Sequence, residues 1–260
     1  MRRIPLPTTA ITLALALTAC GSDKPAHPSP TTAEPEAASY CAQLVGPGKT
    51  VGFKAEQDGT VLRGVEFGTS GTGVVLAHQD QGSVCEWLPF ARKLADKGYH
   101  VLAFDFGGEG DSDKHPGGPS IVGDAVSAAN WLRTRGATNL VLMGASKGGT
   151  ASLAATTKLD PKPKAVVTLS SPVSFASADA LSAASGAAFP VLYIAGEYDS
   201  PFNDDAKQLY DATPPAVGPR LLVVPGAPEH GTALFAGSAA DTVTKAIDDF
   251  LAKNAPPASK

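Results

Sequence analysis

Residues 140–150 read Leu-Val-Leu-Met-Gly-Ala-Ser-Lys-Gly-Gly-Thr, and this stretch decides the fold. The apolar run 140–143 predicts a buried strand, and residues 150–158 suit a helix. Ser146 lies between them with glycine two residues before and two residues after it, an arrangement that no other serine of the chain has. Small residues at these positions let a helix pack closely against the preceding strand. The pattern therefore predicts a strained turn that projects the Ser146 hydroxyl clear of a sheet.

The rest of the chain alternates strand-like and helix-like segments around this stretch. Short runs rich in Val, Leu and Ile predict strands, and amphipathic segments predict helices. The expected strands are 50–54, 61–67, 73–77, 100–104, 140–143, 165–169, 190–195 and 221–224, and the expected helices are 86–97, 120–135, 150–158, 204–212 and 241–252. Apolar strands that alternate with helices indicate a mostly parallel sheet covered on both faces, an α/β fold. The Asp58-Gly59 pair predicts an antiparallel hairpin at one edge.

The order of these elements and the Gly-x-Ser-x-Gly turn resemble the α/β-hydrolase superfamily, over nearly all of residues 50–255. The resemblance implies a serine hydrolase similar to esterases and dienelactone hydrolases, with a triad in the chain order Ser, acid, His. Ser146 is then the nucleophile. His230 is the implied general base, because it alone of the five histidines follows the last suitable acid. Asp199 matches the Gly-x-x-Asp pattern of the superfamily and is the expected acid, with Glu197 as its competitor.

Acyl transfer also needs hydrogen-bond donors that face the developing oxyanion. The resemblance implies that one donor is the backbone N–H of Lys147, at the start of the helix. The second should come from the loop after the strand at 73–77, which begins His-Gln-Asp. Gln79 stands where many relatives have glycine, so the amides of Gln79 and Asp80 both remain candidates. The Lys147 side chain is expected to be solvated, and a cation that assists the oxyanion is the alternative.

The N-terminal sequence predicts export and a lipid anchor. Two arginines and an apolar run at 11–17 form a signal peptide that is too short to span a membrane. Residues 17–20 read Leu-Thr-Ala-Cys, which resembles a bacterial lipobox and implies removal of residues 1–19 and lipidation of Cys20. An ordinary secretion signal is the alternative. Residues 20–39, rich in Pro, Ser and Ala, predict an extended tether. We therefore expect a domain at 40–260 anchored to the outer face of the cytoplasmic membrane.

The cysteines and the charge constrain the class of protein further. Three cysteines are an odd number for an exported chain. Lipidation of Cys20 would leave Cys41 and Cys85, and export favours a disulfide between them over two buried thiols.

The formal net charge is −4, and no basic patch predicts binding to nucleic acid. No metal-ligand spacing or phosphate-binding loop predicts a metal or a cofactor.

Substrate specificity in this superfamily usually comes from a cap after the sixth strand. Here only residues 171–189 are available, and their Ala- and Ser-rich sequence suits one short helix over an open site. The loop 105–113 resembles a glycine-rich loop of the superfamily and is expected to be mainly structural. Four aromatic residues could line the substrate pocket, although each could equally pack in the core: Trp87, Phe106, Phe175 and Phe202.

We expect a small carboxylic ester or thioester as substrate. A peptidase, amidase or acyltransferase is the alternative, and a non-catalytic binding protein is the least favoured.

Overall fold

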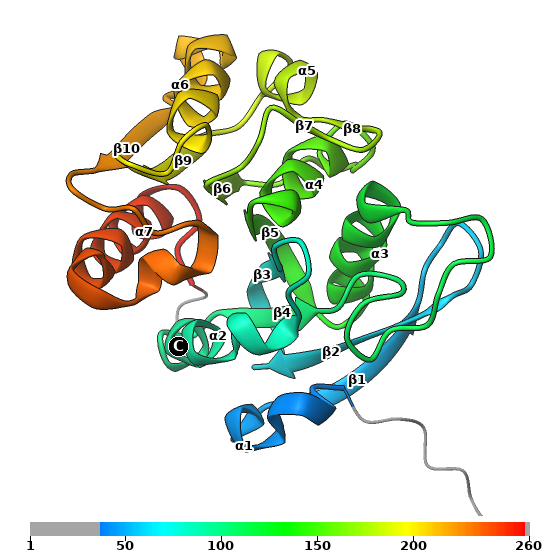
Figure 1. Ribbon diagram of the computed structural model, residues 1–260. Coiled ribbons are helices and arrows are strands. Elements are labelled where there is room, and N and C mark those ends of the chain that lie inside the picture. The colour runs from blue at the N-terminus through cyan, green and yellow to red at the C-terminus, as the bar shows by residue number, and fades with distance from the viewer. Residues whose placement is uncertain (1–36, 258–260) are drawn as a thin grey trace, which may run out of the picture. The chain divides into compact units, whose positions relative to one another are not determined.

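A mostly parallel sheet forms the core of the computed structural model, which describes residues 37–257 (Figure 1). Within this range the sheet has eight strands in the order β1-β2-β4-β3-β5-β6-β9-β10. Their bounds are β1 Lys49–Lys54, β2 Val61–Phe67, β3 Gly71–Ala77, β4 His100–Phe104, β5 Ala137–Ala145, β6 Ala165–Leu169, β9 Val191–Gly196 and β10 Arg220–Val224. The pairs β1–β2 and β2–β4 are antiparallel, and the other pairs are parallel. The predicted sheet with an antiparallel hairpin at one edge is confirmed.

Helices cover both faces of the sheet, as the apolar strands require (Figure 1). One face carries α2 (Leu88–Asp96) and α7 (Ala240–Asn254), and the other carries α3 (Ile121–Thr134), α4 (Lys147–Ala155), α5 (Ala180–Ser185) and α6 (Phe202–Ala212). Successive side chains of a strand point to opposite faces, so Val141 belongs to the first core and Leu142 to the second. Shorter elements are η1 Ser39–Cys41, α1 Ala42–Val45, η2 Val84–Glu86, η3 Pro215–Val217, η4 Gly231–Phe235 and η5 Gly237–Ala239.

The insert after β6 contains more structure than its sequence predicted. A hairpin of two short strands, β7 (Ser174–Phe175) and β8 (Ala178–Asp179), precedes α5. Two-residue strands are too short to show a period, so only the helix was visible in the sequence. The Asp179 side chain caps α5 by accepting a hydrogen bond from the backbone N–H of Ser182 at 2.8 Å. The cap over the site is therefore small, as expected, but mixed in structure.

Three helices begin earlier than their sequences predicted, and α7 does so by a single residue, at Ala240. The helix after the Gly-x-Ser-x-Gly turn begins at Lys147 rather than at residue 150, because the two glycines are part of its first turn. Helix α6 begins at Phe202, with Pro201 as the residue before it. Asp204 and Asp205 consequently lie inside the first turn, where they favour the helix dipole, and do not supply the N-cap.

The N-terminal arm belongs to the packed part of the chain. Ala38 is buried, and Ser39 donates hydrogen bonds from its backbone N–H and its hydroxyl to the Asp111 carboxylate. A disulfide joins Cys41 to Cys85, as the cysteine count favoured. Ala38 and Ser39, which the sequence analysis placed at the end of the tether, thus contact the folded domain. The expected signal peptide, the lipidation site Cys20 and the tether up to residue 36 lie outside the described residues.

Candidate active site

Ser146 stands at the sharp turn between β5 and α4, at the carboxyl end of the strand. Its backbone has φ 48° and ψ −122°, a conformation that costs a non-glycine residue about 1–3 kcal/mol. The glycines on each side are required by space. A Cβ on Gly144 would lie 2.2 Å from the carbonyl carbon of Gly148, and a Cβ on Gly148 would lie 2.2 Å from the Ala77 oxygen. The predicted strained turn, with an almost buried serine at its apex, is present.

His230 and Asp199 meet at the same edge of the sheet. Asp199 follows β9 and His230 follows β10, and the carboxyl ends of these parallel strands adjoin. His230 Nδ1 lies 3.0 Å and 3.1 Å from the two Asp199 carboxylate oxygens. An N–H at Nδ1 leaves Nε2 free to act as a base. The competitor Glu197 accepts a hydrogen bond from the Gly226 amide instead, so the structure pairs His230 with Asp199.

Ser170 and Gln79 hold the loop that carries His230. The Gly231 amide donates to Ser170 Oγ at 2.9 Å, and Ser170 is itself fully buried with a positive φ of 51°. The Thr232 amide donates to the Gln79 side-chain oxygen at 3.3 Å. Ser170 was not predicted from the sequence, because a serine after a strand carries no distinguishing local pattern. Its strained backbone and its contact with the histidine loop become visible only in the fold.

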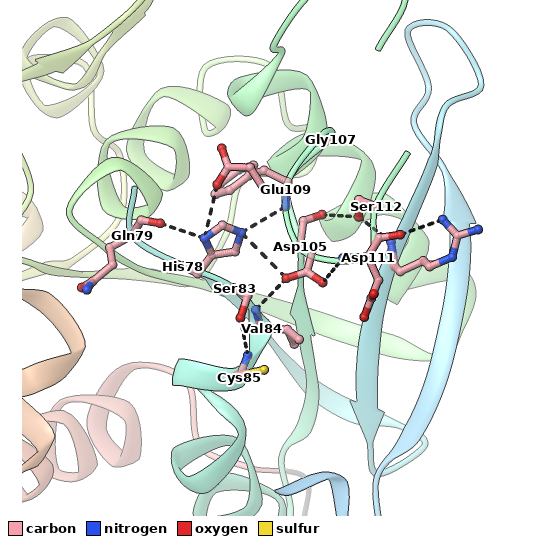
Figure 2. A network of polar contacts seen from close by, with 12 residues as sticks. His78, Gln79, Ser83, Val84, Cys85, Asp105, Gly107, Glu109, Asp111 and Ser112 are labelled. Carbon is pink, nitrogen blue, oxygen red and sulfur yellow. Dashed lines mark hydrogen bonds and ion pairs between the residues drawn. The ribbon is translucent and has the colours of Figure 1, made fainter. Parts of the chain in front are cut away.

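His78 begins the loop after β3, and its ring contacts Gln79 of the same loop (Figure 2). The ring is buried, its Nδ1–H donates to the Gln79 carbonyl at 2.8 Å, and its Nε2 accepts from the Phe106 amide at 3.2 Å. Burial lowers the pKa of His78 to about 4, so the imidazole is neutral at pH 7. Its role is to fix the start of the loop that should supply the second oxyanion donor.

Glu86 lies against the loop that carries the two candidate oxyanion donors, because a Cβ on Gly82 would lie 1.6 Å from its Oε1. Burial raises the pKa of the Glu86 carboxyl, although the hydrogen bond from the Thr232 hydroxyl acts to lower it. The backbone amides of Gln79 and Asp80 both remain candidates for the second donor.

The side chain of Lys147 is buried, so the expectation that it is solvated is wrong. Only 1% of it is exposed, and Nζ lies 2.5 Å from both Glu109 carboxylate oxygens and 3.5 Å from Asp80 Oδ1. Nζ also lies 5.0 Å from the centre of the Phe106 ring. The loop 105–113 covers the start of α4 and supplies Glu109. This loop was expected from the sequence to be mainly structural, and the contact of Glu109 with Lys147 was not predicted.

Asp105 gives the same loop its internal structure (Figure 2). Its carboxylate accepts hydrogen bonds from the amides of Val84 at 2.7 Å and Asp111 at 3.1 Å. Its carbonyl accepts one from the Ser112 hydroxyl at 2.7 Å. Burial raises the pKa of Asp105 to about 6, and the two amides act against that rise. The loop is therefore tied to η2 on one side and to the site on the other.

Two cavities lie beside the loop 105–113 and the small cap rather than at the expected triad. A cavity of about 270 Å³ lies beside Glu109 and His115, and one of about 330 Å³ lies between α3 and the β7–β8 hairpin. None of the three expected triad residues lines either cavity.

Of the four candidate aromatics, Phe202 contacts the His230 ring, at 4.3 Å between ring centres, whereas Trp87 is buried in the core. Phe106 is buried next to His78 and Phe175 is partly buried.

Within residues 37–257, no helix has the length and apolar character needed to cross a membrane. In the same range, no group of three or more His, Cys, Asp or Glu side chains is arranged to hold a metal ion.

The mostly parallel sheet with a sharp Gly-x-Ser-x-Gly turn after β5 is the fold of an α/β hydrolase. The family model described as serine aminopeptidase, S33, matches residues 72–211, more than half of the chain. The chain belongs to this family of hydrolases.

Solved structures share the fold at low sequence identity. An esterase of Pyrococcus furiosus is 17% identical with a TM-score of 0.66, and the match covers 81% of this chain and 92% of the esterase. A dienelactone hydrolase of Anabaena variabilis is 21% identical with a TM-score of 0.63, covering 78% of this chain and 96% of that enzyme. An esterase of Thermogutta terrifontis is 17% identical with a TM-score of 0.64, covering 79% and 98%.

Curated relatives match only a part of the chain. The uncharacterized protein YfhR of Escherichia coli K12 is 34% identical over 112 residues, which is 39% of this chain and 39% of that protein. Its counterpart in Salmonella typhi is 29% identical over 136 residues, 48% of this chain and 42% of that protein. The chain thus matches about two fifths of the length of these relatives.

Proposed function

We propose that this protein is a serine hydrolase that cleaves carboxylic esters or thioesters through an acyl-enzyme. The observation that carries the proposal is the presence of three features at the edge of the sheet where β5, β9 and β10 end. They are a serine in a strained turn, a histidine on the loop after the last strand, and an aspartate bonded to that histidine. Ester-cleaving proteins among the structures of similar fold are consistent with this reaction.

The reaction would follow from the positions of these groups. Ser146 Oγ attacks the acyl carbon as His230 Nε2 takes its proton. Asp199 holds the imidazole in the required tautomer and stabilises the imidazolium. His230 then protonates the leaving alcohol or thiol, and a water molecule, activated by the same histidine, releases the acid.

Two backbone amides would stabilise the oxyanion. Lys147 is the first residue of α4, so its N–H has no intrahelical acceptor and lies at the positive end of the helix dipole. We assign the second donor to the Asp80 amide, because Asp80 stands at the last position of the His-Gly-x pattern that residues 78–80 resemble. The Asp80 side chain is turned towards Lys147, which neutralises part of its charge.

A fluorophosphonate probe tests the nucleophile directly. The full-length protein should be labelled, Ser146→Ala should not, and His230→Ala should be labelled far more slowly because its serine lacks a base. Ser185→Ala, which changes a serine at the end of α5, is the matched control and should be labelled like the wild type. Equal labelling of the Ser146→Ala protein would overturn the assignment.

A peptidase is the second candidate, because the matching family is described as serine aminopeptidase. The two activities share the same groups and differ in the leaving group. Aryl esters of increasing acyl length should be compared with aminoacyl anilides at equal enzyme concentration. A kcat/KM that is higher for every anilide than for every ester would replace the esterase by an aminopeptidase.

We propose in addition that the protein is exported and anchored to the membrane through Cys20. Support comes from the lipobox-like Leu-Thr-Ala-Cys and the Pro-rich segment that follows it. Metabolic labelling with palmitate should mark the wild type and leave Cys20→Ser unlabelled. Label on the Cys20→Ser protein, or none on the wild type, would contradict the anchor.

A further inference from the structure

Lys147 carries a buried charge that the proposed chemistry does not use. An unpaired ammonium group in a protein interior costs several kcal/mol, so its partners indicate its role. Nζ lies 2.5 Å from the Glu109 carboxylate and 3.5 Å from the Asp80 carboxylate. Both carboxylates are partly exposed, with 30% and 46% of their side chains accessible, whereas the ammonium is enclosed. The positive charge therefore faces the two loops and not the solvent.

The three groups come from three neighbouring strands. Asp80 follows β3, Glu109 follows β4 and Lys147 follows β5, and these strands are adjacent in the order β4-β3-β5. The ammonium group thus joins three loops at the edge of the sheet where Ser146 lies. The loops after β3 and β4 are also linked by the contacts of His78 with Phe106 and of Asp105 with Val84, and Lys147 adds the start of α4 to this pair.

We infer that Lys147 is a positioning residue for the oxyanion site. Its ammonium group holds the Asp80 loop so that the backbone amides of Asp80 and Lys147 face the same point. This inference rests on the proposed function, because it concerns the same site. A single residue would then supply one donor through its backbone and orient the other donor through its side chain.

His78 and Lys147 hold the same loop at consecutive residues. Figure 2 shows the His78 side of this arrangement, with Gln79 and Glu109 beside the ring. His78 Nδ1–H fixes the carbonyl of Gln79, and Lys147 engages the side chain of Asp80. Glu109 Oε2 lies 3.8 Å from His78 Nδ1, so it contacts both residues that hold the loop. Loss of the lysine would release the loop at Asp80. It would also leave two carboxylates beside a developing negative charge, which disfavours the transition state.

The test measures kcat and KM of the full-length protein with 4-nitrophenyl acetate. Lys147→Met should lower kcat by about 10- to 100-fold, because loss of one oxyanion donor costs about 100- to 1,000-fold and displacement should cost less. KM should change less than twofold, since oxyanion contacts form in the transition state. Lys158→Met, which changes an exposed lysine beyond the end of α4, is the control and should behave like the wild type. Lys147→Met/Glu109→Gln should lose no more than Lys147→Met alone, because the groups act as a unit.

Two outcomes would overturn the inference while the proposed function stands. One is a Lys147→Met enzyme with wild-type kcat. The other is a raised KM with unchanged kcat, which would place the ammonium group on the substrate. If Lys147→Met fails to fold, Glu109→Gln decides: a severalfold lower kcat at unchanged KM supports the inference, and wild-type kinetics overturn it. A wild-type protein inert to both the ester and the fluorophosphonate would overturn the proposed function, and this inference with it.

Discussion

Asp199 and Glu197 lie two residues apart in one turn, yet they have different partners. Asp199 bonds to His230, whereas Glu197 accepts a hydrogen bond from the Gly226 amide at 2.7 Å. The Gly-x-x-Asp spacing favoured Asp199 from the sequence but left Glu197 open. What separates them is the direction of each side chain relative to β10, and a linear pattern does not contain that direction.

Replacement of Asp199 by Asn is expected to lower kcat by about 1,000- to 10,000-fold. An amide in place of the carboxylate favours the wrong tautomer of His230 and no longer stabilises the imidazolium. The measurement is the initial rate with an aryl ester at pH 7.5. Glu197→Gln is the matched control, with a change of less than threefold expected. Reversed results for the two variants would make Glu197 the acid.

At the scale of elements, the close contact between α4 and the strands beneath it depends on glycine. The Gly148 Cα faces the Ala77 carbonyl of β3, and an added Cβ would lie 2.2 Å from that oxygen. Gly148→Ala should therefore lower the free energy of unfolding by about 2–3 kcal/mol, because the helix must move away from the sheet. Urea unfolding followed by circular dichroism measures the loss.

Gly117→Ala serves as the control for this prediction. A Cβ on Gly117 would meet no atom within 4 Å, and its backbone does not need a positive φ. Its free energy of unfolding should stay within about 0.5 kcal/mol of the wild type. Equal stability of the Gly148→Ala protein would show that the contact can relax at no cost.

The His115 side chain joins its own loop to the β1–β2 turn and to α3, because each ring nitrogen contacts an aspartate. Its Nδ1 and Nε2 lie 2.8 Å from Asp58 in the β1–β2 turn and 2.8 Å from Asp124 in α3. Burial acts to lower the pKa of His115, but the hydrogen bonds and charges of the two aspartates outweigh it and raise the pKa above 6.5. The protonated ring therefore donates from both nitrogens.

The raised pKa of His115 predicts a loss of stability at alkaline pH. The contribution of His115 is fully present below about pH 6.5, the unfolded pKa, and it is lost as the pH rises through the higher pKa of the folded state. Urea unfolding between pH 6 and 9 should show the wild type losing stability more steeply than His115→Gln. Parallel curves for the two proteins would contradict a charged His115.

At the scale of the whole molecule, the disulfide joins the N-terminal arm to the region of the site. Cys85 lies in η2, next to Glu86, and Cys41 lies in η1, 44 residues earlier. The bridge closes a loop that contains β1, β2 and β3. In the chain-entropy model a loop of this length stabilises the folded state by about 4 kcal/mol.

Cys41→Ser/Cys85→Ser should therefore lower the free energy of unfolding by up to about 4 kcal/mol. The urea midpoint of the full-length protein, with and without reductant, is the measurement. Reductant should lower the midpoint of the wild type and of Cys20→Ser, and leave that of the double variant unchanged. Two titratable thiols in the unreduced Cys20→Ser protein would contradict the bridge.

The sequence by itself determined the order of the elements, the bounds of β2, β4 and β6, and the strained turn at Ser146. These features follow from contacts within a few residues, namely the period of apolar side chains and the space that glycine leaves. The tertiary structure decided the burial of Lys147, the contact of Ser170 with the histidine loop, and the contact of His230 with Asp199 rather than with Glu197. Each of these depends on residues far apart in the chain; Glu109, for example, precedes Lys147 by 38 residues. Local patterns cannot encode such contacts, because the packing of the sheet determines which loops meet.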